Sequence, residues 1–504
     1  MGLIPAFIGR LFAPPAAGQR AVMPLVRARY DAERDAADNS KHWANADDYS
    51  ANAANSPGVR RKLRRRARYE RANNSYLNGL VKTIAHDLIG TGPRLQLLLP
   101  AAGVDQRSMG DSLATDAQGR QVERAFAAWA MSVELADKLR VMTEAKLTDG
   151  EGFGVFFTNP VIPGPVKLDM RLIEAEQVST PMPAFDPRHI DGMEFDDRGN
   201  VLAYHVLKQH PGDFARTAAP WEYDTMPAAS VVHWFRADRP GQARGVPEFA
   251  SALPLGAYLR RYTLAVIAAA ETAANLAGVM TTNMPATDGE PVAVESMDEI
   301  QMPRNTLLTL PNGWDAKPFT AAQPTGTYKE FKGEILNEMG RCLGAPFNVI
   351  AGNSSGYNYS SGRLDHQIYH RTLWIERERM RHRVLDKLFR AWLAEYLLIP
   401  PEAGGSPAGL PPVEAWAWEW QWDGFASIDP VKDTAATEAK LRLGLTTRAE
   451  ECAAEGRDWR EVVRQRAAEM AEFTRLGVPE GTEQPAGGVA AGGPGDGEQS
   501  SGGK

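Results

Sequence analysis

A serine flanked by glycines is the first feature of this sequence that could do chemistry. Gly352-Asn353-Ser354-Ser355-Gly356 fits the pattern G-x-S-x-G, in which hydrolases present a nucleophilic serine on a sharp turn from a strand into a helix. Residues 347–351 could form that strand, and His366 and His370 lie downstream. The parallel α/β repeat of a hydrolase is absent around the motif, however. Two interpretations remain, a nucleophile at Ser354 and a flexible Ser/Gly/Asn loop, and the loop is favoured.

Metal and nucleotide sites have weaker support. His366 and His370 would share one face of a predicted helix, but a zincin carries Glu where this chain has Gln367. The run Asp149-Gly150-Glu151-Gly152-Phe153-Gly154 precedes a predicted strand, whereas a dinucleotide fingerprint follows one. No G-x-x-x-x-G-K-[ST] segment occurs, which argues against a packaging ATPase. We therefore expect no catalytic residue, no metal and no cofactor.

One dense basic run stands out, Arg60-Arg61-Lys62-Leu63-Arg64-Arg65-Arg66-Ala67-Arg68. On a helix its arginines would occupy nearly every face, so at least one stripe must meet solvent, acidic neighbours or phosphate. A solvated face or a face between subunits is the simpler interpretation, and contact with DNA or a partner protein is the alternative. We define the basic patch as Arg60, Arg61, Arg64, Arg65, Arg66 and Arg68.

Four tryptophans alternate with other residues near the C-terminal end. Trp416, Trp418, Trp420 and Trp422 would lie on one face of a strand, because strand side chains alternate with a period of two. Such a face belongs more readily to a sheet core or a subunit interface than to a ligand cage.

Composition limits the remaining possibilities. The chain has 504 residues, 43% of them hydrophobic and 24% charged, which is enough for several cores and hence for more than one domain. Its formal charge of -7 argues against a protein that grips nucleic acid tightly. Two distant cysteines, Cys342 and Cys452, exclude a disulfide framework and suit a reducing cytoplasm. The Ala-rich stretch 264–280 falls short of the roughly 20 apolar residues of a membrane span.

The pattern of apolar residues predicts an α+β domain followed by long helices. Residues 57–89 and two stretches within 114–148 have helical periodicity. Strands are predicted at 152–158, 166–173, 193–195, 201–207 and 230–235, with a hairpin turn at 197–200. Further helices are predicted at 255–279, 328–342, 363–397, 430–444 and 447–473. A proline-punctuated insert, 281–326, would contain short strands such as 306–310.

Several of these segments, in this order, resemble the lambda-type portal proteins of tailed bacteriophages and prophages. The segments are Arg71-Ala72-Asn73-Asn74 with Gly79, Ile89-Gly90-Thr91-Gly92, Asp149-Gly150-Glu151, Arg198-Gly199, Tyr204-His205, His233-Trp234-Phe235, Arg239-Pro240-Gly241-Gln242-Ala243-Arg244-Gly245-Val246-Pro247, Gly344-Ala345-Pro346, Asn358-Tyr359-Ser360-Ser361-Gly362-Arg363, Ile428-Asp429-Pro430 with Lys432, and Gly444-Leu445-Thr446-Thr447-Arg448. Each motif is modest alone, and their joint order over about residues 60–470 is specific.

The resemblance implies a portal fold with a mixed α/β wing, a helical stem, a small clip insert and a helical crown. The corresponding parts would be an N-terminal arm 1–56, wing 57–254, stem helix 255–280, clip 281–326, second stem helix 327–343, tunnel loop 344–362, long wing helix with the Trp-rich strand 363–429, crown helices 430–480 and a disordered Gly-rich tail 481–504.

The resemblance also implies a function, a non-enzymatic ring that conducts double-stranded DNA during packaging and ejection at the capsid vertex. Implied partners are other copies in a dodecamer, the large terminase subunit, the major capsid or scaffold protein and a head–tail adaptor. A virion protein assembled in the host cytoplasm is implied, with no membrane partner. The loop residues expected to face DNA are Asn353, Ser354, Ser355, Tyr357, Asn358, Tyr359, Ser360, Ser361 and Arg363. A serine hydrolase, or another virion interaction protein that uses the basic run, remains the alternative.

Overall fold

The computed structural model describes residues 46–99, 112–180, 188–214, 219, 222–275, 278–282, 314–318, 327–425 and 430–477. The chain divides into two compact units, residues 1–54 and residues 55–504. In the first unit the described residues include one short helix, α2 (Ala51–Ala54). Most of the expected arm 1–56, most of the insert 281–326 with its expected strand 306–310, and the tail 481–504 lie outside the described residues.

Two helices joined at an asparagine open the second unit. α3 (Pro57–Asn73) starts with proline, whose missing N–H has no helical partner to lose at that position. The side chain of Asn74 accepts from the backbone N–H groups of Tyr76 and Leu77 and so caps α4 (Ser75–Ile89). The helical periodicity of 57–89 is therefore confirmed, as two helices.

Helices α5 (Ser112–Ser132) and α6 (Leu135–Asp149) confirm the two helical stretches predicted within 114–148. Phe126 and Trp129 of α5 are both buried in the main core. The Phe126 ring packs edge-on against the ring of Trp392 at a centroid distance of 5.2 Å.

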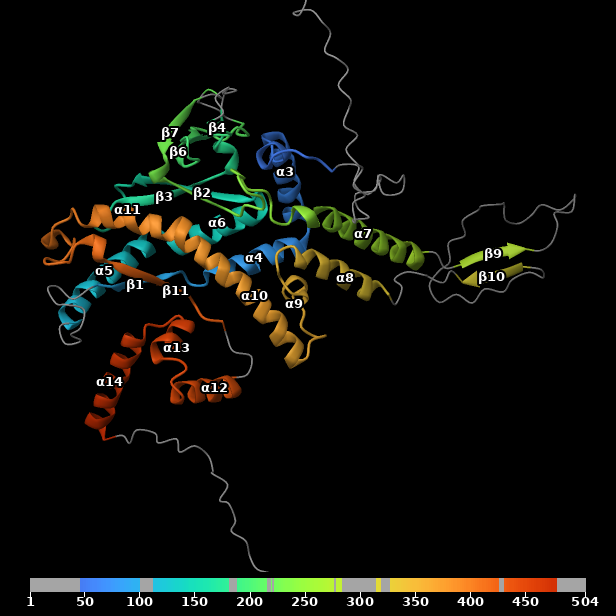
Figure 1. Cartoon of the computed structure of the whole chain (residues 1–504). Helices are drawn as coiled ribbons and strands as arrows, with labels where there is room; N and C mark the ends of the chain where they lie inside the picture. The colour runs from blue at the N-terminus through green and yellow to red at the C-terminus, as the bar shows by residue number, and fades with distance from the viewer. Residues whose placement is uncertain are drawn as a thin grey trace, which may run out of the picture. The chain divides into compact units, whose positions relative to one another are not determined.

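Two antiparallel sheets follow. In the first, β2 (Glu151–Thr158) lies between β3 (Leu168–Ile173) and β8 (Val231–Phe235). The second contains β4 (His189–Ile190), β5 (Met193–Phe195), β6 (Val201–Leu207) and β7 (Tyr223–Pro227), paired in that order. The predicted β5–β6 hairpin is confirmed, and Gly199 supplies the positive φ of its turn. Side chains of both sheets share a second, smaller core. Figure 1 shows the two sheets as neighbours.

A long helix with one π turn runs beside these elements (Figure 1). It consists of α10 (Tyr359–Met380), the π turn η6 (Arg381–Leu385) and α11 (Asp386–Tyr396). Asp386, the first residue after the π turn, accepts the indole N–H groups of Trp418 and Trp420, both at 2.9 Å. These tryptophans lie on β11 (Ala417–Gln421), which pairs antiparallel with β1 (Arg94–Leu98). The Trp-rich strand therefore belongs to the sheet core.

Helices α7 (Leu253–Asn275) and α8 (Tyr328–Arg341) lie side by side in opposite directions (Figure 1). Between these two helices in the sequence lie β9 (Gly278–Thr282) and β10 (Trp314–Pro318), which pair as a two-stranded sheet. The predicted first helix was to continue to about residue 280, but it ends at Asn275. The sequence Gly278-Val279-Met280-Thr281-Thr282 instead forms β9, since Gly disfavours a helix interior and β-branched residues favour strands.

The C-terminal region contains α12 (Pro430–Arg442), α13 (Arg448–Ala454) and α14 (Trp459–Leu476). The single helix predicted over 447–473 is thus two helices. They are separated at Gly456, whose φ of +73° suits glycine and where a Cβ atom would collide with the Trp422 carbonyl.

The α+β class predicted for the chain is confirmed by these sheets and helices. Within the described ranges, no helix has both the length and the apolar character needed to cross a membrane.

Candidate nucleic-acid interface

The segment expected to be one loop over 344–362 contains a helix and a helix start. Residues 347–351, considered above as a strand, form the short helix α9 (Phe347–Ala351), which ends at Gly352 with a φ of +61°. α10 already begins at Tyr359, earlier than the predicted start at 363. The irregular parts of the segment are therefore residues 344–346 and 352–358, and the second of them contains the first of the residues expected to face DNA.

Residues 352–358 are shaped by their own short polar side chains. The Asn353 side chain accepts from the Ser355 N–H at 2.9 Å, and the Ser354 carbonyl accepts from the Tyr357 N–H at 3.0 Å. Asn358 caps α10 by accepting from the Ser361 N–H at 2.9 Å. Exposed residues among those expected to face DNA are Asn353, Ser354, Ser355, Asn358, Ser360, Ser361 and Arg363, while Tyr357 is half-buried. The side chain of Tyr359 is not among those that the structure describes.

Ser354 does not occupy the position of a hydrolase nucleophile. A helix, not a strand, precedes it. Its Oγ lies 3.5 Å from Asn348 Nδ2, and Asn348 Nδ2 in turn lies 2.8 Å from His366 Nε2. An amide therefore stands between the serine and the histidine, and an amide cannot take the proton that a general base must remove.

The two histidines of α10 also have structural neighbours. The His370 ring stacks on Phe425 at a centroid distance of 3.8 Å, and its centroid is 5.6 Å from that of His366. Burial lowers the pKa of His370, and the nearby His366 acts in the same direction. Neither histidine belongs to a three-residue metal-ligand group among the described residues.

Arg363 was expected to face DNA or a neighbouring subunit. Its Nη2 lies 3.4 Å from Asp433 Oδ1 of α12 in the same chain. The two side chains are still 46% and 41% exposed. The one cation among the expected loop residues is therefore partly neutralised within the chain.

The basic run divides into an inner and an outer half. Arg60 and Arg64 are buried, with side chains about 5% exposed, and Arg68 is partly buried. Arg60 pairs with Asp191, Arg64 with Glu151, and Arg68 with Asp149. The exposed half comprises Arg61, Arg65 and Arg66. Of the six arginines in the basic patch, these three remain available on the surface for DNA or a partner.

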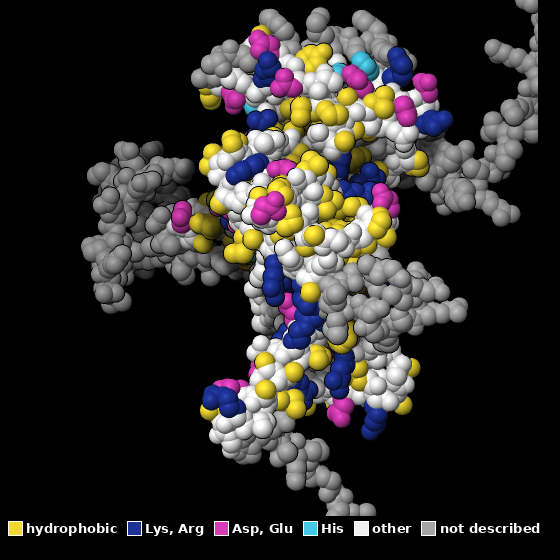
Figure 2. Space-filling view, turned by 90° about the vertical axis from the view of Figure 1, so that its left-hand side faces the viewer, with side chains coloured by type: hydrophobic (Ala, Val, Ile, Leu, Met, Phe, Trp, Pro, Cys, Tyr) yellow, Lys and Arg dark blue, Asp and Glu magenta, His cyan; other side chains and the backbone are white. Residues whose placement is uncertain are grey.

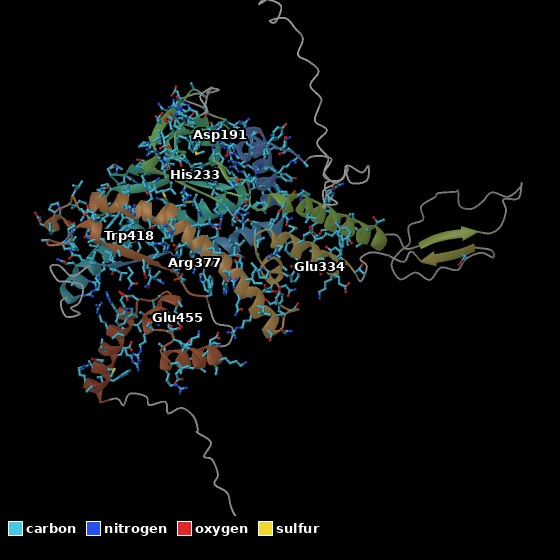
Figure 3. All side chains as sticks on the ribbon, viewed as in Figure 1. Asp191, His233, Glu334, Arg377, Trp418 and Glu455 are labelled. Carbon is cyan, nitrogen blue, oxygen red and sulfur yellow. The ribbon has the colours of Figure 1, made fainter. Side chains whose placement is uncertain are left out.

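The two buried arginines of the inner half, Arg60 and Arg64, belong to a larger cluster centred on Glu151. We call this cluster the ionic hub, and its members are Arg60, Arg64, Glu151, Asp191, His233 and Arg244. The Glu151 side chain is fully buried and accepts from Arg64, from two guanidinium nitrogens of Arg244, from His233 Nε2 at 3.0 Å and from the Gly245 N–H at 3.2 Å. Arg244 also pairs with Asp191 at 3.2 Å. Figure 3 labels two members of the hub, Asp191 and His233. The hub joins α3, both sheets and the segment after β8.

Two of the motifs that carried the resemblance meet at this hub. A Cβ on Gly245 would collide with the Gly150 carbonyl oxygen, and one on Gly150, whose φ is +90°, would collide with the Val246 backbone. Asp149-Gly150-Glu151 and Arg244-Gly245-Val246-Pro247 therefore need both glycines to pack against each other. The sequence showed the motifs but not this contact.

The ionisation of the hub follows from burial and from its partners. Burial alone would raise the pKa of Glu151, but Arg244, His233 and Arg64 hold that pKa well below its ordinary value. Burial lowers the pKa of the His233 imidazole, opposed by its hydrogen bond to Glu151. Glu151 is thus a carboxylate near neutral pH and His233 is neutral.

Replacement of the two halves of the basic run should have different effects. Arg61, Arg65 and Arg66 changed to Ala should each alter the free energy of unfolding by no more than about 0.5 kcal/mol, as exposed residues do. Arg64→Ala should cost about 2 kcal/mol, since Glu151 would lose one charged hydrogen bond and keep its others. Chemical denaturation of the four variants measures this. A loss at Arg65 as large as that at Arg64 would contradict the division.

One group among the described residues has metal-ligand composition, Glu174, Glu176 and His210. Arg68 already pairs with both carboxylates, at 3.1 and 2.9 Å. The Gly212 N–H donates to His210 Nδ1 at 3.0 Å, which places the proton of a neutral ring on Nε2. Nε2 is the nitrogen nearest the carboxylates, and in this tautomer it carries a proton in place of the lone pair that a metal would need, although it makes no hydrogen bond here.

Comparison with known proteins places the chain beside phage portal proteins. Residues 37–376 match the family model described as phage portal protein, lambda family. The chain is 24% identical over 505 residues to a probable portal protein of Halomonas phage phiHAP-1, covering 94% of this chain and 91% of that one. It is 22% identical to portal protein B of Escherichia phage lambda, covering 62% of this chain and 64% of that one. A solved chain from the neck of a native GTA particle, computed with C12 symmetry, is similar with a TM-score of 0.45 and 14% identity, covering 80% and 94%.

Proposed function

Because the chain belongs to the lambda family of phage portal proteins, we propose that it forms a ring that conducts double-stranded DNA into and out of a capsid. Portal proteins are structural components of the virion at the head–tail connector. The finer proposal is a dodecamer that docks the large terminase subunit during packaging and a head–tail adaptor afterwards. It contacts the major capsid or scaffold protein and assembles in the host cytoplasm.

The exposed polar loop at residues 352–358 is the observation that carries the conduit proposal. Its Asn and Ser side chains offer hydrogen bonds to phosphate without a full charge. Duplex DNA carries one negative charge per about 1.7 Å, so a wall with many free cations would bind it tightly. Uncharged donors and a partly neutralised Arg363 instead permit short contacts that the moving duplex can exchange.

The charge of the whole chain supports the same proposal. The formal charge is -7, and on the face shown in Figure 2 acidic, basic and hydrophobic side chains are interspersed. A continuous basic field would be expected for a protein that holds DNA in place. We therefore propose non-specific and weak DNA contact.

The parts of a portal can be assigned as proposals. Support for a stem at 255–280 and 327–343 comes from the antiparallel pair α7 and α8, and support for a clip at 281–326 from the β9–β10 sheet between them. The two mixed sheets and α10 support a wing at 57–254 and 363–429, and α12–α14 support a crown at 430–480.

Electron microscopy of the purified full-length chain tests the ring directly. We expect class averages of a ring with a central hole, and twelve copies by native mass spectrometry. A chain that stays monomeric under all conditions, including with added adaptor or scaffold protein, would contradict the proposal.

Cationic substitutions test the loop. Asn353→Lys, Ser354→Lys and Ser355→Lys together should slow DNA translocation in an in vitro packaging reaction with proheads and terminase. Each subunit would place three new charges beside phosphate, and the delay should shrink as salt rises. The matched triple Ala variant should package at nearly the wild-type rate. If the Lys and Ala variants were equally slow at every salt concentration, the loop would not face DNA.

A further inference from the structure

We infer that α7 and α8 carry the two complementary halves of a contact between copies of this chain. In this contact the outward face of α7 of one copy, around Arg261, lies in the groove along α8 of the next copy, around Glu334 and Glu338. The inference rests on the proposed ring, because a head-to-tail ring needs two different surfaces on each subunit.

The first half is a groove between the start of α7 and the length of α8. Its cavity measures about 660 Å³ and is lined by Leu255, Phe331, Glu334, Glu338 and Arg341, among others. Phe331 contacts Tyr262 of α7 at a ring-centroid distance of 5.3 Å, yet remains 51% exposed. Glu334 lies on α8 as Figure 3 shows, and both glutamates are exposed. The groove thus combines an apolar floor with a rim that carries Arg341 and is acidic along Glu334 and Glu338.

The second half is the face of α7 that turns away from its neighbours. Arg260 points inward and pairs with Glu70 at 2.8 Å, and Tyr262 points toward α8. The outward face carries Tyr258, which is 65% exposed, and Arg261. Ala265 and Ala268 continue this face at helical spacing, and such small residues let another helix approach closely. Leu264, 59% exposed, lies at its edge.

Charge complementarity indicates which partner fits. Three charged residues form no ion pair with any other residue in the described ranges, namely Arg261, Glu334 and Glu338. Arg260, which precedes Arg261 in the sequence, does form one, with Glu70. The outward face of α7 cannot reach the groove of its own chain, because that groove contains the opposite side of α7. Between two copies, Arg261 could meet the acidic rim while Tyr258 packs near Phe331. An apolar centre with charges at the rim is the usual form of a specific interface.

Charge reversal on each half provides the test. Arg261→Glu alone and Glu334→Arg alone should each lose most rings, with a rise of about tenfold or more in the protein concentration needed for half assembly, because each places like charges opposite each other. The two variants mixed in equal amounts should recover rings. Alternating copies then place the glutamate introduced in one variant opposite the arginine introduced in the other, and the unchanged Arg261 opposite the unchanged Glu334.

A charge-matched control and two readouts complete this test. Lys82→Glu, at an exposed site on α4, makes the same change in net charge as Arg261→Glu and should assemble as wild type. Ring fraction is read by size-exclusion chromatography with light scattering and by electron microscopy.

The outcomes separate this inference from the ring itself. Wild-type rings, failed single variants and recovery on mixing would support the contact. Wild-type rings with single variants that assemble normally would overturn the contact and leave the ring intact. Single variants that form no rings, and that still form none when mixed, would also overturn the contact. The groove would then have to bind another partner. A wild-type chain without rings would instead contradict the proposed function.

Discussion

Glu151→Gln is expected to lower the free energy of unfolding of the second unit by about 3–5 kcal/mol, the cost of leaving buried charges without their counterion. Glu151 is fully buried and is the shared acceptor of Arg64, Arg244 and His233. Glutamine keeps the size of the side chain and removes its charge. Two buried guanidinium groups would then face each other with no carboxylate between them, so the loss should exceed that of a single hydrogen bond.

The pH dependence of stability gives a second measure of the same hub. The pKa of Glu151 lies well below its ordinary 4.5, so its contribution is present above pH 4.5 and is lost as pH falls below it. The pKa of His233 lies below 6.5, so protonation of the unfolded chain destabilises the fold as pH falls below 6.5. Below pH 4.5 the wild-type chain should lose stability in part because Glu151 becomes protonated. That part of the loss should be absent from Glu151→Gln.

Denaturant unfolding from pH 2 to pH 8 checks both expectations, since the loss that belongs to Glu151 begins only below pH 4.5. Glu414→Gln, at an exposed position before β11, makes the same chemical change without a buried partner and should behave as wild type. Equal stability of the two variants at pH 7 would show that Glu151 does not hold the hub together.

Arg377→Ala is expected to release the segment that leads from the core toward the C-terminal helices. Arg377 is buried in α10 and donates to the carbonyls of Asp87 and Leu88 at 2.9 Å and of Asp423 at 3.1 Å. Its guanidinium carbon lies 5.3 Å from the ring centroid of Trp422. Removal should cost about 3 kcal/mol, because three carbonyls lose a charged donor and an aromatic ring loses its cation.

Hydrogen exchange locates this effect. Amides of residues 422–425 and of α12–α14 should exchange faster in Arg377→Ala, while those of β2 and β6 should keep their protection. Arg377→Lys should rescue little, since an ammonium group cannot reproduce the planar fork that reaches several carbonyls. Arg371→Ala, an exposed arginine of the same helix, is the control. Unchanged exchange in residues 422–425 would contradict this role.

Local pattern predicted most of the secondary structure, and its errors have local causes. The β5–β6 hairpin and the long helix 363–397 followed from alternation and helical periodicity, which depend on near neighbours. The start of α10 at Tyr359 was missed, because the Asn358 and Ser361 capping pair resembles an ordinary polar loop in sequence. The break at Gly456 was also missed, because it depends on the close approach of the Trp422 carbonyl.

The basic run marks the limit of what the sequence by itself could determine. The apolar pattern predicted an α+β protein, and the motifs in their order resembled those of portal proteins, a resemblance that the family match confirms. They could not show that Arg60 and Arg64 point inward, because every face of that helix carries an arginine. The acid that decides the matter, Glu151, lies 87 residues from Arg64 and 93 from Arg244. Only the packing of α3 against α6, the helix that leads directly into β2, brings these charges into one buried site, where low solvent access makes their pairing obligatory.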